Sequence, residues 1–168
     1  ASGKWEDAKE PLEKLIALYP QYAGDGNAYQ LLAEAHRNLG ETEQERAVLN
    51  KLASKSCDAI YAYGRLMEIA VEKKDWQEVV ANAEKYMAVY PLLSSLHWQL
   101  GRANEELSRD EQAIESYRRL LRLSPADPAD INYRLGRLLQ HTDPAAAKRH
   151  VLMALAEAPR FREAHRLL

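Results

Sequence analysis

Three prolines at equal distances constrain the fold of this chain more than any other feature. Pro91, Pro125 and Pro159 are each 34 residues apart, and Cys57 stands one further period before Pro91. A leucine–glycine pair at 100–101 returns at 135–136, one residue out of step. Self-similarity at a fixed period of this size predicts stacked supersecondary units, because each unit is too small to bury its own apolar face.

Apolar residues recur every three or four positions within each period, which predicts helices. In residues 94–127 we expect a helix A over 94–107 and a helix B over 110–123, joined by a turn at 108–109. Asp143 followed by Pro144 predicts a helix start, since the carboxylate caps an orphan amide and proline has no amide to satisfy. Asp75 before Trp76 marks the same turn in another unit.

The repeated pattern resembles the tetratricopeptide repeat family. The resemblance rests on a small residue in helix A, an alanine or valine early in helix B, a large residue one turn later, and a closing proline. The small residues are Ala33, Gly101 and Gly136, and the alanines or valine are Ala8, Val79, Ala113 and Ala147. The large residues are Leu12, Leu49, Tyr117 and Leu152, and the closing prolines are Pro20, Pro91, Pro125 and Pro159. The pattern is broken locally, because Met67 stands at a small position and Glu45 at an alanine position.

The resemblance implies an all-α fold, a right-handed superhelical solenoid of antiparallel helix pairs. We expect a single helical-repeat domain over residues 1–168. Its parts are a helix B of a partial unit at 5–22, units at 26–59, 60–93, 94–127 and 128–161, and the start of a further unit at 162–168.

The ends of the pattern fall in mid-unit, which predicts a segment of a longer repeat protein. We expect such open ends to favour end-to-end association through exposed apolar residues. These are Leu12, Leu15, Leu167 and Leu168. Pro11 lies inside the first helix pattern, so that helix is expected to kink there or to begin near residue 10.

The charge and composition argue against several classes of protein. The net charge is −2 and the pI is about 6.3, whereas a nucleic-acid-binding protein more often carries a basic excess. No run approaches the ~18 apolar residues of a membrane span, and no signal segment is present. We therefore expect no nucleic-acid partner and no membrane segment in these residues. The default expectation for the compartment is cytoplasmic, unless a signal or membrane segment lies outside these residues.

The titratable residues form no catalytic or metal-binding motif. No two of the five histidines stand four apart around a glutamate, as in helical zinc enzymes. The glycines are isolated rather than gathered in a phosphate-binding loop, and Cys57 is the only cysteine. We expect no enzyme activity, no metal and no cofactor.

A binding surface is the remaining functional feature. The resemblance implies that helix A of each unit lines the concave side of the solenoid, where equivalent positions repeat. Trp98/Arg102 and Tyr133/Arg137 are aromatic–arginine pairs at equivalent places, suited to stacking on a peptide and pairing with its carboxylate. Alternatively, Trp98 belongs to the packing between helices. The candidate groove residues are Gln30, Glu34, Tyr61, Arg65, Trp98, Arg102, Tyr133 and Arg137.

Two functions remain open at this point. The first is a non-catalytic interaction scaffold that binds a protein or peptide segment in its concave groove. The second is a structural or regulatory repeat tail of a larger enzyme or secretion component, with no free peptide ligand. Family members that clamp a C-terminal carboxylate use a lysine–asparagine set; Gln30 and Glu34 stand in its place, and Glu34 would repel that ligand. We exclude that subtype.

Overall fold

The computed structural model describes residues 2–168, with side chains from residue 4 onward, and these residues form ten helices and no strands. The all-α prediction is confirmed. The chain divides into two compact parts, Ala1–Pro91 and Leu92–Leu168. They are larger than the repeats expected from the sequence and are called unit 1 and unit 2 from here on. Each unit is described by itself below.

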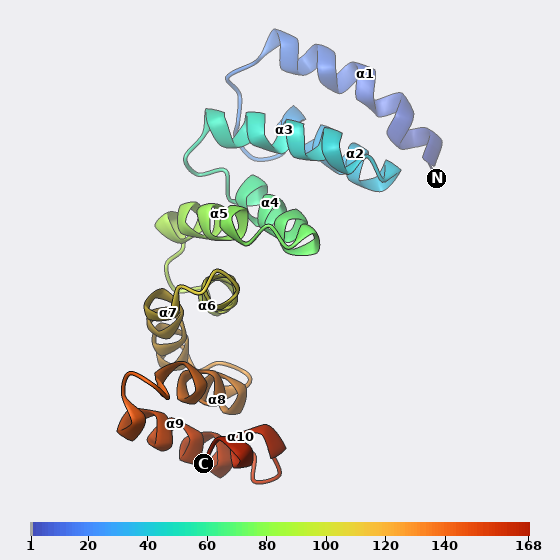
Figure 1. The fold of residues 1–168 in the computed structure, drawn as a ribbon. Coiled ribbons are helices and arrows are strands. Elements are labelled where there is room, and N and C mark those ends of the chain that lie inside the picture. Colours follow the sequence, from blue (N-terminus) through green and yellow to red (C-terminus); the bar gives the residue numbers. More distant parts are fainter. Residues whose placement is uncertain (1) are drawn as a thin grey trace. The chain divides into compact units, whose positions relative to one another are not determined.

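Unit 1 contains five helices, and each packs on the next along the chain (Figure 1). They are α1 (Ser2–Leu18), α2 (Ala28–Leu39), α3 (Thr42–Lys55), α4 (Ile60–Lys73) and α5 (Trp76–Val89). α1 continues through Pro11, so the expectation that this helix begins near residue 10 is wrong. The core of the unit gathers buried side chains from α2, α3 and α4, among them Leu32, Leu49 and Leu66.

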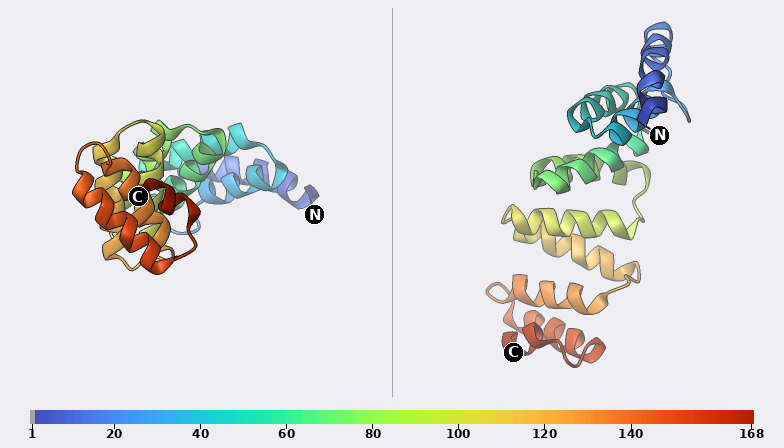
Figure 2. Two further views of the ribbon diagram at one scale, coloured as in Figure 1. Left: turned by 60° about the horizontal axis from the view of Figure 1, so that its bottom comes forward. Right: turned by 90° about the vertical axis from the view of Figure 1, so that its right-hand side faces the viewer.

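Unit 2 repeats the same arrangement with five further helices, seen from two more directions in Figure 2. They are α6 (Ser94–Glu106), α7 (Asp110–Arg122), α8 (Pro128–Leu139), α9 (Pro144–Glu157) and α10 (Arg162–Leu167). The core of α7, α8 and α9 includes the buried residues Tyr117 and Leu135, and Trp98 of α6 packs against it. None of the helices in residues 2–168 is long and apolar enough to span a membrane.

Local capping sets several of the helix starts. The Oδ1 atom of Asp143 accepts a hydrogen bond from the Ala146 amide at 2.9 Å, and Pro144 is the first helical residue. Asp75 accepts from the Glu78 amide at 3.1 Å. The predicted cap at Asp143 is confirmed, and Asp75, expected at a turn, caps α5. Each satisfies an amide that the helix itself cannot pair, an effect worth ~1 kcal/mol.

Glycines in helix A allow the two helices of a repeat to approach closely. A Cβ atom at Gly101 would lie 2.3 Å from the Tyr117 ring, and one at Gly136 would lie 2.5 Å from a methyl group of Val151. The prediction that Leu152 is the large packing residue of the last full repeat is wrong. Val151 is 1% exposed and fills this place, whereas Leu152 is 49% exposed.

The leucines predicted at open ends differ in their exposure. Leu15 and Leu168 are exposed. Leu12 and Leu167 instead pack partly against the buried cores of their own units. The prediction of exposure therefore holds for two of these four side chains.

Candidate peptide-binding surface

The candidate residues of unit 1 lie on α2 and α4 and are engaged within the unit. The side-chain amide of Gln30 donates to Glu34 at 3.2 Å. Burial raises the pKa of the Tyr61 phenol to about 12, and the negative charge of Glu34 adds to the increase. Because burial and a nearby carboxylate both disfavour the phenolate, Tyr61 stays neutral at any physiological pH.

Arg65 is held by two carboxylates. Its Nε and Nη2 atoms donate to Glu45 at 2.6 and 3.2 Å, and Nη1 donates to Glu68 at 2.8 Å. Glu45 is 1% exposed and belongs to α3, so this pair joins two neighbouring repeats. The hydrogen bonds to Glu45 are the largest cause that raises the pKa of Arg65. Glu45, the exception to the alanine pattern, is therefore explained by a buried ion pair.

The candidate residues of unit 2 lie on α6 and α8. Trp98 and Arg102 are partly buried on α6. Tyr133 of α8 packs against Phe161, with ring centroids 4.9 Å apart. Arg137 of α8 is half exposed and forms an ion pair with Glu105 of α6. Both predicted aromatic–arginine pairs thus lie on neighbouring A helices of one unit, and whether they contact a ligand remains a prediction.

Arg134 is the residue of this surface that sequence reasoning missed. Its guanidinium carbon lies over the Trp98 ring, 5.0 Å from the centroid, in a cation–π arrangement. The same side chain donates to Glu105 at 2.6 Å and to Asp130 at 2.8 Å. The spacing of Asp130 and Arg134 by four residues on a helix is a signal that could have suggested part of this arrangement.

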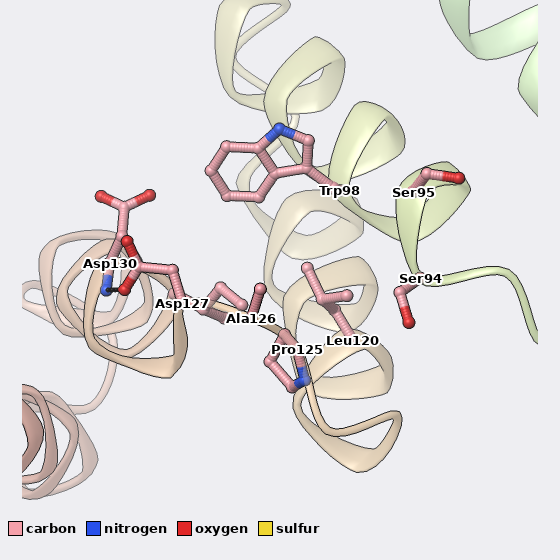
Figure 3. Close-up of a pocket in the computed structure, with 9 residues that line it drawn as sticks. Ser94, Ser95, Trp98, Leu120, Pro125, Ala126, Asp127 and Asp130 are labelled. Carbon is pink, nitrogen blue, oxygen red and sulfur yellow. Dashed lines mark hydrogen bonds between the residues drawn. The ribbon is translucent and has the colours of Figure 1, made fainter.

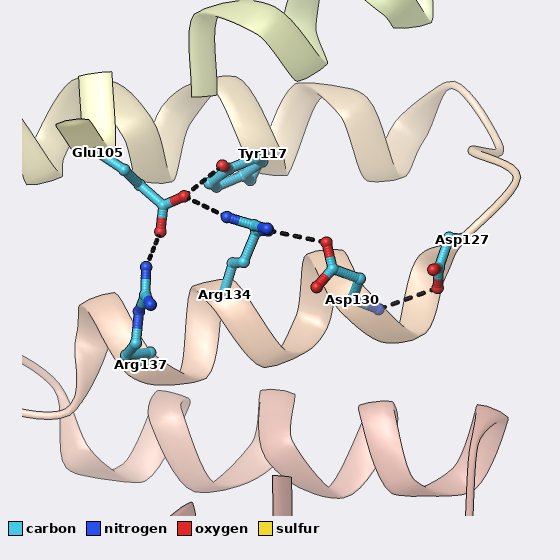
Figure 4. A network of polar contacts seen from close by, with 6 residues as sticks. All are labelled: Glu105, Tyr117, Asp127, Asp130, Arg134 and Arg137. Atoms are coloured by element: carbon cyan, nitrogen blue, oxygen red, sulfur yellow. Dashed lines mark hydrogen bonds and ion pairs between the residues drawn. The ribbon is translucent and has the colours of Figure 1, made fainter. Parts of the chain in front are cut away.

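Glu105 is the centre of a polar network between α6, α7 and α8 (Figure 4). Its side chain is only 8% exposed, and it accepts hydrogen bonds from the Tyr117 hydroxyl at 2.6 Å, from Arg134 and from Arg137. Burial, followed by the hydrogen bond to Glu105, raises the pKa of Tyr117. Burial lowers the pKa of Arg134, but its hydrogen bonds to carboxylates outweigh that effect and the net shift is upward. The network keeps α6 and α8 in register beside Trp98.

A pocket of about 320 Å³ lies beside Trp98, entirely within unit 2. We call it the Trp98 pocket. It is bounded by one end of α6, by the α7–α8 connection and by the start of α8 (Figure 3). Its lining residues are Ser94, Ser95, Trp98, Leu120, Pro125, Ala126, Asp127, Asp130 and Ile131. One of them, Trp98, is among the groove residues expected from the sequence.

The chemical character of the Trp98 pocket is mixed. Leu120 and Ile131 belong to the core, and together with the indole of Trp98, Pro125 and Ala126 they make an apolar wall. Figure 3 shows the carboxylates of Asp127 and Asp130 at one edge and two serine hydroxyls at the other. An apolar cavity with a few convergent polar groups is the usual form of a ligand site. At ~30 Å³ per water molecule, its volume corresponds to about ten water molecules, which leaves room for one long side chain.

A second hollow, of about 300 Å³, lies in unit 1 beside the connection from α1 to α2. Aliphatic and aromatic side chains line most of it, including Leu15, Ile16, Tyr19 and Tyr22. Its lining contains no charged side chain. The Trp98 pocket is therefore the better candidate for a specific site.

Two of the histidines and the cysteine contact neighbouring side chains. His36 contacts Glu41 through Nδ1 at 2.6 Å, and His150 contacts the Asn132 side chain at 2.8 Å. Cys57 is exposed and its thiol donates to Asp58 at 3.4 Å. Within the described residues, no three histidine, cysteine or acidic side chains are grouped so as to hold a metal ion.

Comparison with known proteins agrees with the repeat pattern. Family models described as tetratricopeptide repeat match residues 1–22, 26–54 and 94–127, about half of the chain. A curated relative, the human laminin subunit gamma-1, is 29% identical over 130 residues, which make up 75% of this chain. The chain spans only 8% of the length of that protein.

Solved structures of repeat proteins are similar over nearly the whole chain. A crystal structure of MamA has a TM-score of 0.67 and 15% identity, and the match covers 94% of this chain and 90% of that one. MamA from Desulfovibrio magneticus RS-1 has a TM-score of 0.64 and 19% identity, covering 95% and 89%. YrrB, described as a TPR protein with an unusual peptide-binding site, has a TM-score of 0.68 and 14% identity, covering 98% and 83%. At these identities the likeness establishes the fold.

Proposed function

Because the chain belongs to the tetratricopeptide repeat family, we propose that it is a non-catalytic scaffold that binds a protein or peptide segment on the α6–α8 face of unit 2. The repeats themselves support a role in protein–protein interaction. The position of the binding site on this face is the proposal. It corresponds to the concave groove expected from the arrangement of A helices.

The observation that carries the proposal is the Trp98 pocket. It opens between helix A of one repeat and helix A of the next, where an extended segment lying across the repeats would pass. A partly buried tryptophan in such a pocket is typical of the anchor residues that dominate binding energy. The Glu105 network supports the site, because it holds Trp98 and the start of α8 in place without a ligand, and a preorganised site loses less entropy on binding. YrrB gives a precedent for peptide binding on this fold.

The test is a selection of short peptides from a random display library against the whole chain. Selected peptides are then titrated by fluorescence anisotropy against wild type and Ser95→Trp. Ser95 is exposed and lines the pocket, so a large side chain there fills the pocket without disturbing the core. The matched control is Gln112→Trp, an exposed residue of α7 outside the pocket lining.

We expect Ser95→Trp to weaken binding about tenfold or more, a loss of ~1.4 kcal/mol or greater, with Gln112→Trp unchanged. If selection yields no peptide, or if Ser95→Trp binds as well as wild type, the proposed site is wrong. The first of these results would favour the alternative, a structural repeat tail without a free peptide ligand.

A further inference from the structure

The Trp98 pocket has a polarity that restricts what can enter it. Of its nine lining residues two are aspartates, and none is a lysine, an arginine or a histidine. Asp127 uses Oδ1 to cap α8, accepting from the Asp130 amide at 3.0 Å. Asp130 uses Oδ2 to accept from Arg134 at 2.8 Å. A carboxylate offers about four acceptor positions, so these contacts leave both groups able to accept further hydrogen bonds.

The charges around the pocket do not cancel within the contacts of Figure 4. Arg134 and Arg137 pair with Glu105 and Asp130, which makes two cations against two anions. Asp127 adds one more negative charge at the edge of the pocket. Its carboxylate accepts from the Asp130 amide, which is neutral and so does not offset that charge. Among these residues an anionic ligand group would therefore meet one more negative charge than positive charges.

A wholly apolar side chain is also a poor fit. It would cover the apolar wall of Trp98, Pro125 and Ala126, but it would also displace water from the two carboxylates. Taking water from a carboxylate without replacing its hydrogen bonds is costly. An occupant that satisfies both parts of the pocket needs an apolar stem and a cationic end.

We propose that the Trp98 pocket binds the side chain of a lysine or arginine from an extended peptide segment, a specificity that rests on the peptide binding proposed above. The aliphatic stem lies against the indole of Trp98, Pro125 and Ala126. The cationic end donates to Asp127 and Asp130. Long basic side chains bury their methylene groups in this way while their charge stays at a polar edge. The charge of this ligand group is opposite to that of the peptide carboxylate that the arginines of this face suggested from the sequence.

The geometry around Trp98 agrees with a cationic occupant. One cation, Arg134, lies over the indole ring at 5.0 Å while its guanidinium pairs with Glu105 and Asp130, so the combination proposed for the ligand, a cation beside this ring and an aspartate, occurs once within the protein itself. Charge-assisted hydrogen bonds to a carboxylate are about twice as strong as neutral ones. Lysine and arginine should therefore be preferred over an uncharged side chain of equal length.

The experiment uses the peptides selected against the whole chain. Each selected peptide is resynthesised with its basic residues replaced one at a time by norleucine, which keeps the stem and lacks the charge. Both forms are titrated against wild type, Asp127→Asn, and the double variant Asp127→Asn/Asp130→Asn. Asparagine caps a helix as well as aspartate does, so Asp127→Asn removes the charge and keeps the start of α8. The matched control is Asp143→Asn, the same change at the cap of α9 and outside the pocket.

We expect selected peptides to be enriched in lysine or arginine, and one norleucine replacement to weaken binding to wild type about tenfold, ~1.4 kcal/mol. In the double variant this difference should fall to about twofold, with Asp127→Asn intermediate and Asp143→Asn like wild type. Circular dichroism spectra confirm that each variant is folded, and Asp127→Asn alone suffices if the double variant is not.

The remaining outcomes separate this inference from the proposed function. Peptides that bind in a Ser95-dependent way, but show no enrichment of basic residues or no norleucine effect, overturn the inference and leave peptide binding standing. A lysine preference that survives in the aspartate variants also overturns it. Failure to select any peptide, or binding insensitive to Ser95→Trp, overturns the proposed function and the inference with it.

Discussion

The buried pair of Glu45 and Arg65 offers the sharpest test of how the repeats are held together. We consider the change Arg65→Met, which keeps most of the length of the stem and removes the charge. The Glu45 carboxylate is 1% exposed and receives two hydrogen bonds from Arg65, at 2.6 and 3.2 Å. Removing one partner of a buried pair leaves an uncompensated buried charge, which costs ~3–5 kcal/mol.

The reverse change should cost much less, because the two partners differ in exposure. In Glu45→Ala the Arg65 side chain, 12% exposed, keeps its contact with Glu68 and can gain water. Alanine is also the residue that the repeat places here, as at Ala113 and Ala147. We expect a loss of ~1 kcal/mol, the usual net worth of a hydrogen-bonded contact. The double variant should lie within ~1 kcal/mol of wild type, since replacing a buried pair by apolar residues is often neutral.

Urea unfolding followed by far-ultraviolet circular dichroism measures these differences. With a slope of ~1–3 kcal/mol per molar urea, a loss of ~3–5 kcal/mol in Arg65→Met should lower the midpoint by roughly 1–5 M. Amide hydrogen exchange of α3 and α4 locates the loss, because neighbouring repeats unfold partly independently. Arg119→Met is the control: it breaks an exposed pair with Glu115 and should cost less than ~1 kcal/mol.

Two results would refute this reasoning. One is an Arg65→Met protein as stable as the Arg119→Met control. The other is a double variant no more stable than Arg65→Met, which would mean that the loss comes from packing of the arginine stem and not from the unpaired carboxylate.

Three further predictions concern the space beside two helix A glycines, a buried tyrosine hydrogen bond and the titration of a histidine. Gly101→Ala should destabilise the protein by ~1–3 kcal/mol, because the new Cβ atom would lie 2.3 Å from the fully buried Tyr117 ring. Gly64→Ala, at 3.2 Å from the less buried Tyr86 ring, should be close to neutral, and equal urea midpoints for the two variants would contradict this. Tyr117→Phe should lower the free energy of unfolding by ~1–3 kcal/mol, because Glu105 loses a 2.6 Å hydrogen bond. Thermal melts at neutral pH measure this loss. A loss under ~0.5 kcal/mol would show that the arginines alone satisfy Glu105. Burial and two neighbouring arginines lower the pKa of His150 below its ordinary value of ~6.5. The folded protein therefore favours the neutral imidazole. The stability that this preference contributes is present above pH ~6.5 and is lost as the pH falls through the lowered pKa. His150→Gln should therefore lose less stability than wild type between neutral pH and pH ~5 in urea titrations, and identical pH profiles would speak against this assignment.

Local chemistry made much of the fold readable from the sequence. The helix starts at Trp76 and Pro144 follow from aspartates that cap amides within three residues, an interaction that needs no tertiary partner. The period of 34 residues follows from the need of every repeat to pack on the next, and the small residues at Gly101 and Gly136 follow from the close approach of the two helices within a repeat. Trp98 could be named as a candidate groove residue because equivalent helix A positions repeat along the chain.

The partners of individual side chains depended on the tertiary structure. The role of Glu45 is set by Arg65, twenty residues away on another helix, and the cation over Trp98 is Arg134 of α8 instead of a residue of its own helix. Val151, and not Leu152, fills the space at Gly136 because one residue turns a helix by ~100°, so a single-residue error of register moves a side chain from the core to the surface. Composition and period determine that helices stack in pairs. The rotation and approach of neighbouring helices decide which charged side chains meet between them, and therefore which charges lie beside the Trp98 pocket. No single helix encodes that arrangement.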